Sequence, residues 1–352
     1  MRKCPFMKEN NPLERKRYKR IQTNSIHTEE IIRNLKAGQL QAVSRAITLV
    51  ESRADAYRLQ AEAILQSILP NTGNSVRIGI SGVPGAGKST FIENMGLYLC
   101  ERGLKVAVLA IDPSSSISGG SILGDKTRME ELSKHPNAFI RPSPTGGKLG
   151  GVHQKTRESM MICEAAGYSV IIVETVGVGQ SEAEVRDMVD FFLLLTLTGA
   201  GDELQGMKKG ILELVDGIAV NKADGENERL AMLAKEEYRQ ILRDHIPATK
   251  DWTVRTFACS ALHKKGLHEI WESILEFCDF TKDTGEFSRR RESQISKWFK
   301  SEVEQQILDH FYSNQAVKKF FPIVEAKVRD GEKITSKAAA ELFHLYFSAK
   351  EQ

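Results

Sequence analysis

The sequence GVPGAGKST at residues 82–90 places three glycines, a lysine and two hydroxyl side chains directly after the apolar run VRIGIS (76–81). The phosphate-loop pattern G-x-x-x-x-G-K-[ST] is matched at every defined position. In such a loop, glycines let backbone N–H groups approach phosphate oxygens, and the next helix directs its positive end toward them. A nucleoside triphosphate is therefore the predicted ligand. Its predicted contacts are Gly82, Val83, Pro84, Gly85, Ala86, Gly87, Lys88, Ser89 and Thr90.

Two side chains of this loop carry specific predicted roles. Lys88 is expected to reach the β- and γ-phosphates, and the Ser89 hydroxyl is expected to bind Mg²⁺. A chance match in a glycine-rich turn is the alternative. The position of the motif between a predicted strand and a predicted helix argues against it.

Seven short apolar runs alternate with helical stretches from residue 76 onward. The runs are rich in Val, Ile, Phe and Leu and are continuous rather than alternating, which is typical of strands covered on both faces in a mostly parallel sheet. We therefore expect an α/β phosphate-loop domain over residues 70–282. The runs are VRIGIS (76–81), KVAVLAI (105–111), NAFIR (137–141), SVIIVE (169–174), FFLLLTL (191–197), GIAVN (217–221) and TVRTFACS (253–260).

Helical extensions are expected on both sides of this domain. Residues 1–69 are interpreted as a basic tail and a helical extension, with two helices over residues 26–67. Residues 283–352 are interpreted as a helical arm, with three helices separated near SNQ and RDGEKITS. Apolar side chains recur at helical spacing in this arm and need a partner surface, so we predict a homodimer formed through it. They include Ile295, Trp298, Phe299, Val303 and Ile307.

Composition excludes little but gives no sign of a nucleic-acid or membrane partner. The chain has 352 residues and a net charge of +3, and residues 1–24 hold eight Lys/Arg against two Glu. No apolar run approaches the length of a membrane span, and no secretory leader is evident. The five scattered cysteines suggest a reducing compartment. A cytoplasmic location is expected, with the mitochondrial matrix as the alternative for a eukaryotic source.

Two short motifs point to guanine as the base. The sequence NKAD (221–224) follows an apolar strand, and its Asp224 can accept hydrogen bonds from N1–H and the exocyclic amine of guanine. Adenine lacks that amine, so the carboxylate discriminates against it. Asn221 is expected to tie this loop to the phosphate loop, and the stem of Lys222 is expected to lie along the base. In CSAL (259–262), the predicted contacts are Ser260, Ala261 and Leu262, with the Ala261 N–H near guanine O6.

Carboxylates at strand ends provide candidate Mg²⁺ ligands beside Ser89. Asp112 and Glu174 end predicted strands, and strand ends surround the ligand crevice in open α/β sheets. Asp125 lies in a Gly/Ser-rich loop and is a third candidate. The alternatives are strand-end capping for Asp112 and Glu174 and a solvated loop charge for Asp125.

With these motifs, the chain resembles the MeaB/ArgK/MMAA-type GTPases, which assist adenosylcobalamin-dependent methylmalonyl-CoA mutase. The resemblance runs through most of the core, and the helical flanks look like that family's N-terminal extension and dimerisation arm. Thr198 departs from it, since proline is expected there. The matching segments are GVPGAGKST, AIDPSSSISGGSILGDKTRM, ETVGVGQSE, GAGDELQGMKKGI, NKAD and CSALHKKGL.

The resemblance implies three switch segments, at residues 112–130, 174–186 and 199–211. Lys208 in the third segment is a candidate for stabilising charge on the γ-phosphate. Val178 follows Gly177 and cannot orient a water molecule, while Gln180 lies two residues further on. Lys88, Glu174, Gln180 and Lys208 are therefore the catalytic candidates, and slow, partner-stimulated GTP hydrolysis is expected.

The expected function is a GTPase chaperone that gates adenosylcobalamin loading, protection or reactivation of methylmalonyl-CoA mutase or a related acyl-CoA mutase. Two alternatives stay open. One is a metallochaperone GTPase, although no Cys–His cluster has ligand spacing. The other is an ATP-dependent kinase linked to basic amino-acid transport, which NKAD opposes.

Overall fold

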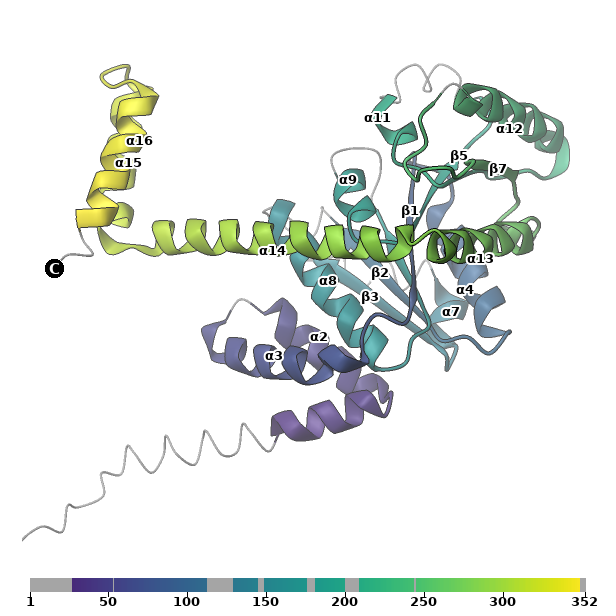
Figure 1. Ribbon diagram of the computed structural model, residues 1–352, viewed down its shortest axis with the longest axis horizontal. Helices are drawn as coiled ribbons and strands as arrows, with labels where there is room; N and C mark the ends of the chain where they lie inside the picture. Colours follow the sequence, from purple (N-terminus) through teal and green to yellow (C-terminus); the bar gives the residue numbers. More distant parts are fainter. Residues whose placement is uncertain are drawn as a thin grey trace, which may run out of the picture. The chain divides into compact units, whose positions relative to one another are not determined.

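The computed structural model describes residues 27–52, 54–112, 129–144, 149–175, 181–199, 209–243 and 245–348. Contacts divide the chain into two units, Met1–Arg291 and Glu292–Gln352. The first unit is built on a seven-stranded sheet in which every pair of neighbouring strands is parallel (Figure 1). The predicted α/β class is confirmed. The strands are β1 (Val76–Gly82), β2 (Val106–Asp112), β3 (Ala138–Pro144), β4 (Val170–Glu174), β5 (Phe191–Thr196), β6 (Gly217–Val220) and β7 (Arg255–Ala258).

The strand order places the phosphate-loop strand at the centre of the sheet. The order is β3-β2-β4-β1-β5-β6-β7, so the chain moves outward from β1 to β3, returns to β4 and then continues on the other side of β1. Ligands bind outside the carboxyl ends of strands at such a reversal, because the connecting loops diverge there. The ends of β1, β4 and β6 therefore bring residues distant in sequence to one edge of the sheet.

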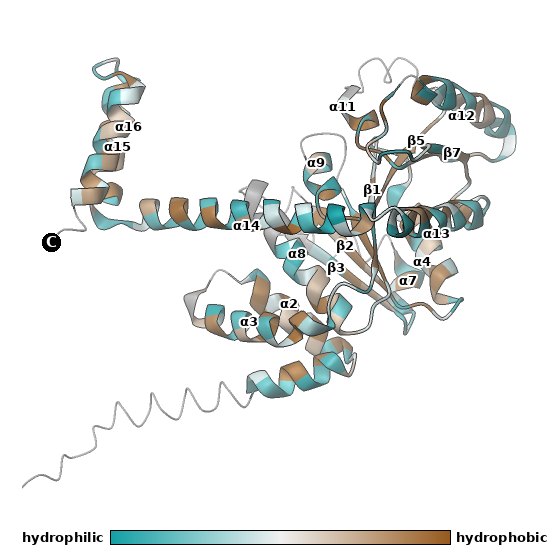
Figure 2. Ribbon diagram, viewed as in Figure 1, coloured by the Kyte–Doolittle hydropathy of each residue, from teal (hydrophilic) through white to brown (hydrophobic). Residues whose placement is uncertain are grey.

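Helices cover the sheet, and its central strands β5 and β6 are almost entirely apolar. Every residue of β5 and β6 is buried, and Figure 2 shows the central strands in the colour of hydrophobic residues. Continuous burial explains why these runs do not alternate between apolar and polar residues. The helices of this unit that follow β1 are α4 (Lys88–Cys100), α7 (Glu130–Lys134), α8 (Leu149–Ala165), α9 (Ser181–Arg186), α11 (Lys209–Leu212), α12 (Glu228–Arg243) and α13 (Leu267–Asp283).

The N-terminal extension has three helical segments where two were predicted. They are residues 27–36, α2 (Leu40–Glu51) and α3 (Asp55–Ile68), followed by the short helix η1 (Leu69–Asn71). Gly38 causes the additional break, because its φ of +74° is left-handed and ends the first segment. Its N–H donates to the Leu35 carbonyl at 2.8 Å, which is a C-terminal cap.

The C-terminal unit is helical, as expected, and has a small core of its own. The long helix α14 (Glu286–Ser313) is followed by α15 (Gln315–Arg329) and α16 (Thr335–Ser348). Asn314 caps α15, since its side chain accepts from the N–H groups of Ala316 and Val317. The core consists of Phe311, Val317, Val324, Ala338 and Leu342.

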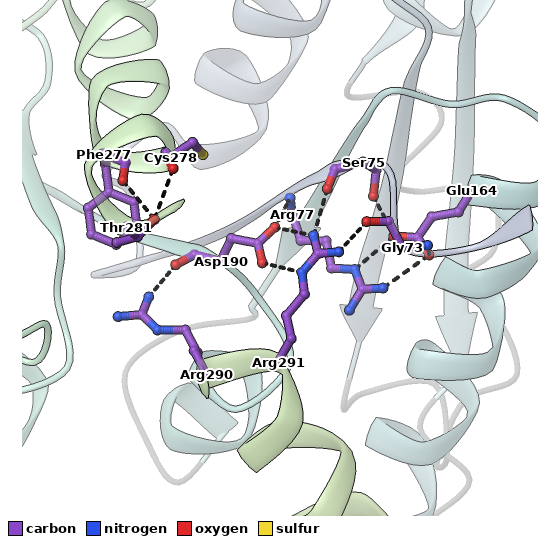
Figure 3. A network of polar contacts seen from close by, with 10 residues as sticks. All are labelled: Gly73, Ser75, Arg77, Glu164, Asp190, Phe277, Cys278, Thr281, Arg290 and Arg291. Carbon is purple, nitrogen blue, oxygen red and sulfur yellow. Dashed lines mark hydrogen bonds and ion pairs between the residues drawn. The ribbon is translucent and has the colours of Figure 1, made fainter. Parts of the chain in front are cut away.

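A network of buried charges joins the N-terminal part of α14 to the sheet (Figure 3). Asp190, which directly precedes β5, is 1 % exposed and accepts from Arg291 Nε at 2.9 Å and from Arg291 Nη2 at 2.8 Å. It also accepts from the Arg77 N–H at 2.8 Å. The Arg77 side chain in turn donates two hydrogen bonds to Glu164. Burial alone would raise the pKa of Glu164, but Arg77 and Ser75 bring that pKa below its ordinary value.

A second buried carboxylate, Asp216, extends this network toward α9. It is fully buried and accepts from Thr249 Oγ1 at 2.6 Å, from the Phe192 N–H at 3.0 Å and from Arg186 Nη2 at 3.2 Å. Arg290 Nη1 lies 3.6 Å from Asp216 Oδ2. Asp216 therefore holds α9, β5 and the start of α14 together from the loop before β6.

We predict that Asp190→Asn lowers the free energy of unfolding by about 3 kcal/mol, because removing one partner leaves the other charge buried without compensation. The measurement is urea unfolding of the purified protein. Arg289→Ala is the control, since its pairing with Glu286 is exposed on the arginine side and contributes about 1 kcal/mol or less. Equal losses in the two variants would contradict the prediction.

Candidate functional site

The phosphate-binding loop connects β1 to α4 and is shaped by its glycines. Gly85 and Gly87 have φ angles of +80° and +82°, in the left-handed region that residues with a Cβ rarely adopt. Val83 and Ala86 are buried, whereas Pro84 and Gly85 are exposed. The loop is therefore anchored through its apolar side chains and presents its glycine-rich tip to solvent.

Gly82 meets a different constraint, the close approach of two backbones. It pairs with Leu195 of β5, and a Cβ on Gly82 would lie 2.1 Å from the Leu195 carbonyl oxygen. No side chain fits at that distance. The loop thus begins where β1 and β5 are too close for any residue but glycine.

Helix α4 begins at Lys88 and directs its N-terminus at the loop. Its N-cap residue is Gly87, which provides no side-chain cap. Four N–H groups at a helix N-terminus lack intrahelical partners, and together with the helix dipole they attract an anion. Thr90 lies half-buried in this first turn. This geometry suits the phosphate group that the sequence predicts.

The Lys88 ammonium lies over the loop. Its Nζ donates to the Gly82 carbonyl at 2.8 Å and to the Val83 carbonyl at 3.4 Å. An ammonium group has three donors, so one more is available to a phosphate oxygen. Burial lowers the pKa of Lys88, while the carboxylates of Glu174 and Glu182 oppose that shift.

The two predicted metal ligands that the structure describes in full lie together. Ser89 Oγ in α4 is 3.4 Å from Glu174 Oε1 in β4, although the two residues are 85 positions apart in sequence. A hydroxyl and a carboxylate are oxygen donors of the kind that Mg²⁺ prefers, so this pair fits the predicted ion. Asp112 ends β2, as predicted, but its side chain lies outside the described part of the structure.

Glu182 also belongs to this region, although sequence reasoning did not select it. Its side chain is 2 % exposed, and Ser81 Oγ donates to Glu182 Oε1 at 3.4 Å. Thr175 Oγ1 donates to Ser81 Oγ at 2.9 Å and links Glu182 to the residue after Glu174. The available signal was an acidic residue in the first turn of the helix that follows β4. Its burial beside a phosphate loop was not visible in the sequence.

The base-recognition loop is held to the phosphate loop by Asn221. Its Nδ2 donates to the Ala86 carbonyl at 2.8 Å, and its Oδ1 accepts from the Ala261 N–H at 2.9 Å. A Cβ on Gly87 would lie 2.8 Å from the same Nδ2. One amide therefore joins the phosphate loop, the NKAD loop and the CSAL loop. The link between the phosphate loop and the NKAD loop was predicted from the sequence, and the link to the CSAL loop was not.

Asp224 is oriented by Ser260, whose hydroxyl donates to Asp224 Oδ2. Ser260 Oγ also accepts from the His263 N–H at 3.2 Å. The carboxylate thus has one oxygen held by the CSAL loop, and its other oxygen can accept from a base. This supports Asp224 as the predicted reader of guanine.

The remaining base-site residues differ in how well they fit their predicted roles. Lys222 is exposed and has a left-handed φ of +60°, which leaves its stem accessible to a base. Leu262 is 70 % exposed. The Ala261 N–H already donates to Asn221, so its predicted contact with guanine O6 requires a shared hydrogen bond. Three further predicted site residues, Asp125, Gln180 and Lys208, lie outside the described residues.

The family pattern of the methylmalonyl Co-A mutase-associated GTPase MeaB matches residues 43–316 of this chain. The chain belongs to the MeaB family. It is 49 % identical over 311 residues to a probable GTPase of Mycobacterium tuberculosis, covering 88 % of this chain and 93 % of that protein. It is 46 % identical over 300 residues to the GTPase ArgK of Escherichia coli, covering 85 % and 90 %.

Two further relatives extend the similarity. The mitochondrial methylmalonic aciduria type A homolog of Mus musculus is 41 % identical over 330 residues, covering 91 % of this chain and 80 % of that protein. A crystal structure named LAO/AO transport system kinase superposes with a TM-score of 0.71 at 37 % identity, covering 90 % of this chain and 96 % of the other. The MeaB-family chain is accordingly a GTPase that binds guanine nucleotides.

We predict that Asp224→Asn weakens GTP binding and makes the MeaB-family protein prefer xanthosine triphosphate. The 2-oxo group of xanthine replaces the guanine amine, and the asparagine amide can donate to it where a carboxylate can only accept. Competition of GTP and XTP against a fluorescent GDP analogue measures the preference. Asp251→Asn provides a matched control, because Asp251 is an exposed aspartate outside these motifs. An unchanged GTP/XTP ratio in Asp224→Asn would refute the assigned role.

Proposed function

We propose that this GTPase is a chaperone for an adenosylcobalamin-dependent mutase of the methylmalonyl-CoA type, and that it gates the loading, protection or reactivation of that cofactor. The observation that carries the proposal is the match of residues 43–316 to a mutase-associated GTPase family. The phosphate and base loops that the structure assembles lie within that range. The mouse relative is likewise named for methylmalonic aciduria.

Hydrolysis of GTP at this site depends on positioning and electrostatics. Lys88 and the backbone N–H groups of the loop would hold the β- and γ-phosphates, and Ser89 and Glu174 would hold Mg²⁺. The ion would neutralise charge that develops on the phosphate oxygens. Burial lowers the pKa of Lys88, and the carboxylates of Glu174 and Glu182 oppose that shift. We infer slow intrinsic turnover, since residue 178 is a valine and offers no group to orient water.

Two other functions receive less support. A metallochaperone needs a metal-binding cluster, and the described ranges contain no group of three or more His, Cys, Asp or Glu side chains that could hold an ion. A kinase of a transport system would use ATP, which the Asp224 carboxylate disfavours. No helix within the described ranges has the length and apolar character needed to cross a membrane.

We further propose that the chain forms a homodimer through its C-terminal unit. Ile295, Phe299, Val303 and Ile307 follow one another at intervals of four along α14 and are between 41 % and 69 % exposed. Burial of a large apolar side chain stabilises an interface by about 1.5–3 kcal/mol. A stripe of this kind in a single chain favours association with a second copy.

We predict that Phe299→Glu shifts the full-length protein from dimer to monomer, because it places a charge in the centre of this stripe. Sedimentation velocity over a range of concentrations measures the change. Lys300→Glu is the control, since it introduces a carboxylate at the neighbouring position on a side chain that is 80 % exposed. A Phe299→Glu protein that stays dimeric would exclude this interface.

The mutase itself tests the proposed function. We predict that an adenosylcobalamin-dependent acyl-CoA mutase of the same organism accelerates GTP turnover by about tenfold or more, because a partner can complete a site that lacks a water-orienting group. Phosphate release is measured with the mutase in its apo and cobalamin-loaded forms. Lys88→Ala should abolish turnover under both conditions. Absence of stimulation by every such mutase of the organism would overturn the partner assignment.

A further inference from the structure

Asn227 lies just after the NKAD loop and contacts that loop twice. Its Nδ2 donates to the Lys222 carbonyl at 2.7 Å, and its backbone N–H donates to the Asp224 carbonyl at 3.1 Å. The two acceptors are the backbone carbonyls of Lys222 and Asp224, which lie at the two ends of the short segment that contains the base-reading carboxylate. Asn227 therefore holds this segment from both ends.

The held segment has a backbone conformation that needs support. Lys222 has φ of +60°, and a left-handed residue other than glycine costs on the order of 1 kcal/mol. Hydrogen bonds to the carbonyl of the same residue offset that cost. The Asn227 side chain supplies one, and the Ala223 N–H of the same peptide group donates to the Cys259 carbonyl at 2.9 Å.

Thr198 anchors the Asn227 amide from the other side. Thr198 Oγ1 donates to Asn227 Oδ1 at 2.7 Å, across 29 positions of sequence from the end of β5. With Oδ1 occupied as an acceptor, Nδ2 faces the Lys222 carbonyl. If the amide rotated by half a turn, an oxygen would face that carbonyl and an amine would face the hydroxyl. The Lys222 carbonyl can only accept, so it selects the orientation with Nδ2 toward the loop, and the Thr198 hydroxyl then anchors Oδ1 to the end of β5.

We propose that Asn227 is a positioning residue for guanine recognition and that Thr198 anchors its side-chain amide. Neither side chain is required to touch the nucleotide. They act through the backbone of residues 222–224, which places the Asp224 carboxylate for the exocyclic amine of the base. The inference rests on the proposed role of Asp224 and is independent of the mutase.

Discrimination between guanine and hypoxanthine reports this positioning, because hypoxanthine differs from guanine only by lacking the exocyclic amine. A displaced Asp224 loses part of a contact that GDP makes and IDP cannot make. The affinity ratio of GDP to IDP should therefore fall, whereas general loosening of the phosphate site would weaken both ligands equally. Displacement of a fluorescent GDP analogue from the full-length protein gives both affinities.

The expected fall is about threefold for Thr198→Val and about tenfold for Asn227→Ala, as for the loss of one or two neutral hydrogen bonds. Thr198→Ser keeps the hydroxyl and should retain the wild-type ratio. Thr72→Val removes a hydroxyl that donates to the Leu69 carbonyl elsewhere and should also leave the ratio unchanged. The double variant should lose no more than Asn227→Ala alone, because both residues act along one path.

A folded Asn227→Ala protein with the wild-type ratio would overturn the proposal, as would additive losses in the double variant. Should Asn227→Ala fail to fold, Thr198→Val decides, because it keeps the shape of a half-exposed side chain and removes one hydroxyl. Asp224→Asn distinguishes failure of the role of Asp224 from failure of the positioning role of Asn227. If that variant leaves the base preference untouched, the role of Asp224 fails; if it alone changes the preference, the positioning role fails.

Discussion

The nucleotide site depends on one amide, the side chain of Asn221. Its Nδ2 donates to the phosphate loop at Ala86, and its Oδ1 accepts from the CSAL loop at Ala261. A buried amide that satisfies both its donor and its acceptor is costly to disrupt, because either loss leaves a polar group without compensation. Asn221 thereby sets the distance between the phosphate subsite and the base subsite. A nucleotide has a fixed length, so both of its ends can bind only if this distance is fixed as well.

The charges buried beneath this site have a different task from those within it. Asp190 and Asp216 are paired with arginines of α9 and α14, and Asp190 also accepts from a backbone N–H of β1, so these carboxylates hold helices against the sheet. Glu174 instead lies beside Ser89, and the charges of Glu174 and Glu182 oppose the effect of burial on the pKa of Lys88 in the phosphate loop. Arg186 and Glu182 belong to the same short helix, α9. The structural network and the catalytic region thus meet in one element.

The strongest sequence predictions concerned the phosphate loop, which binds its ligand through backbone N–H groups, and the strands, which are recognised from short runs of neighbouring residues. The phosphate loop was predictable because the glycines at 85 and 87 encode local φ angles and Lys88 follows at once. The central strands were predictable because a strand covered on both faces is largely apolar. The break at Gly38 was missed, since one glycine within a helical pattern is compatible with a continuous helix and only the cap shows that the helix ends.

By itself, the sequence determined that the chain has a parallel α/β core with a phosphate loop and a guanine-reading motif, because each of these depends on neighbouring residues or on a short period. Only the tertiary structure decided which side chains meet. Strand order, which no local pattern encodes, brings Ser89 to Glu174, Ser81 to Glu182 and Thr198 to Asn227. These pairs are separated by 29 to 101 positions, and their contact energies arise only after the sheet has formed. Their identity is therefore a property of the folded chain.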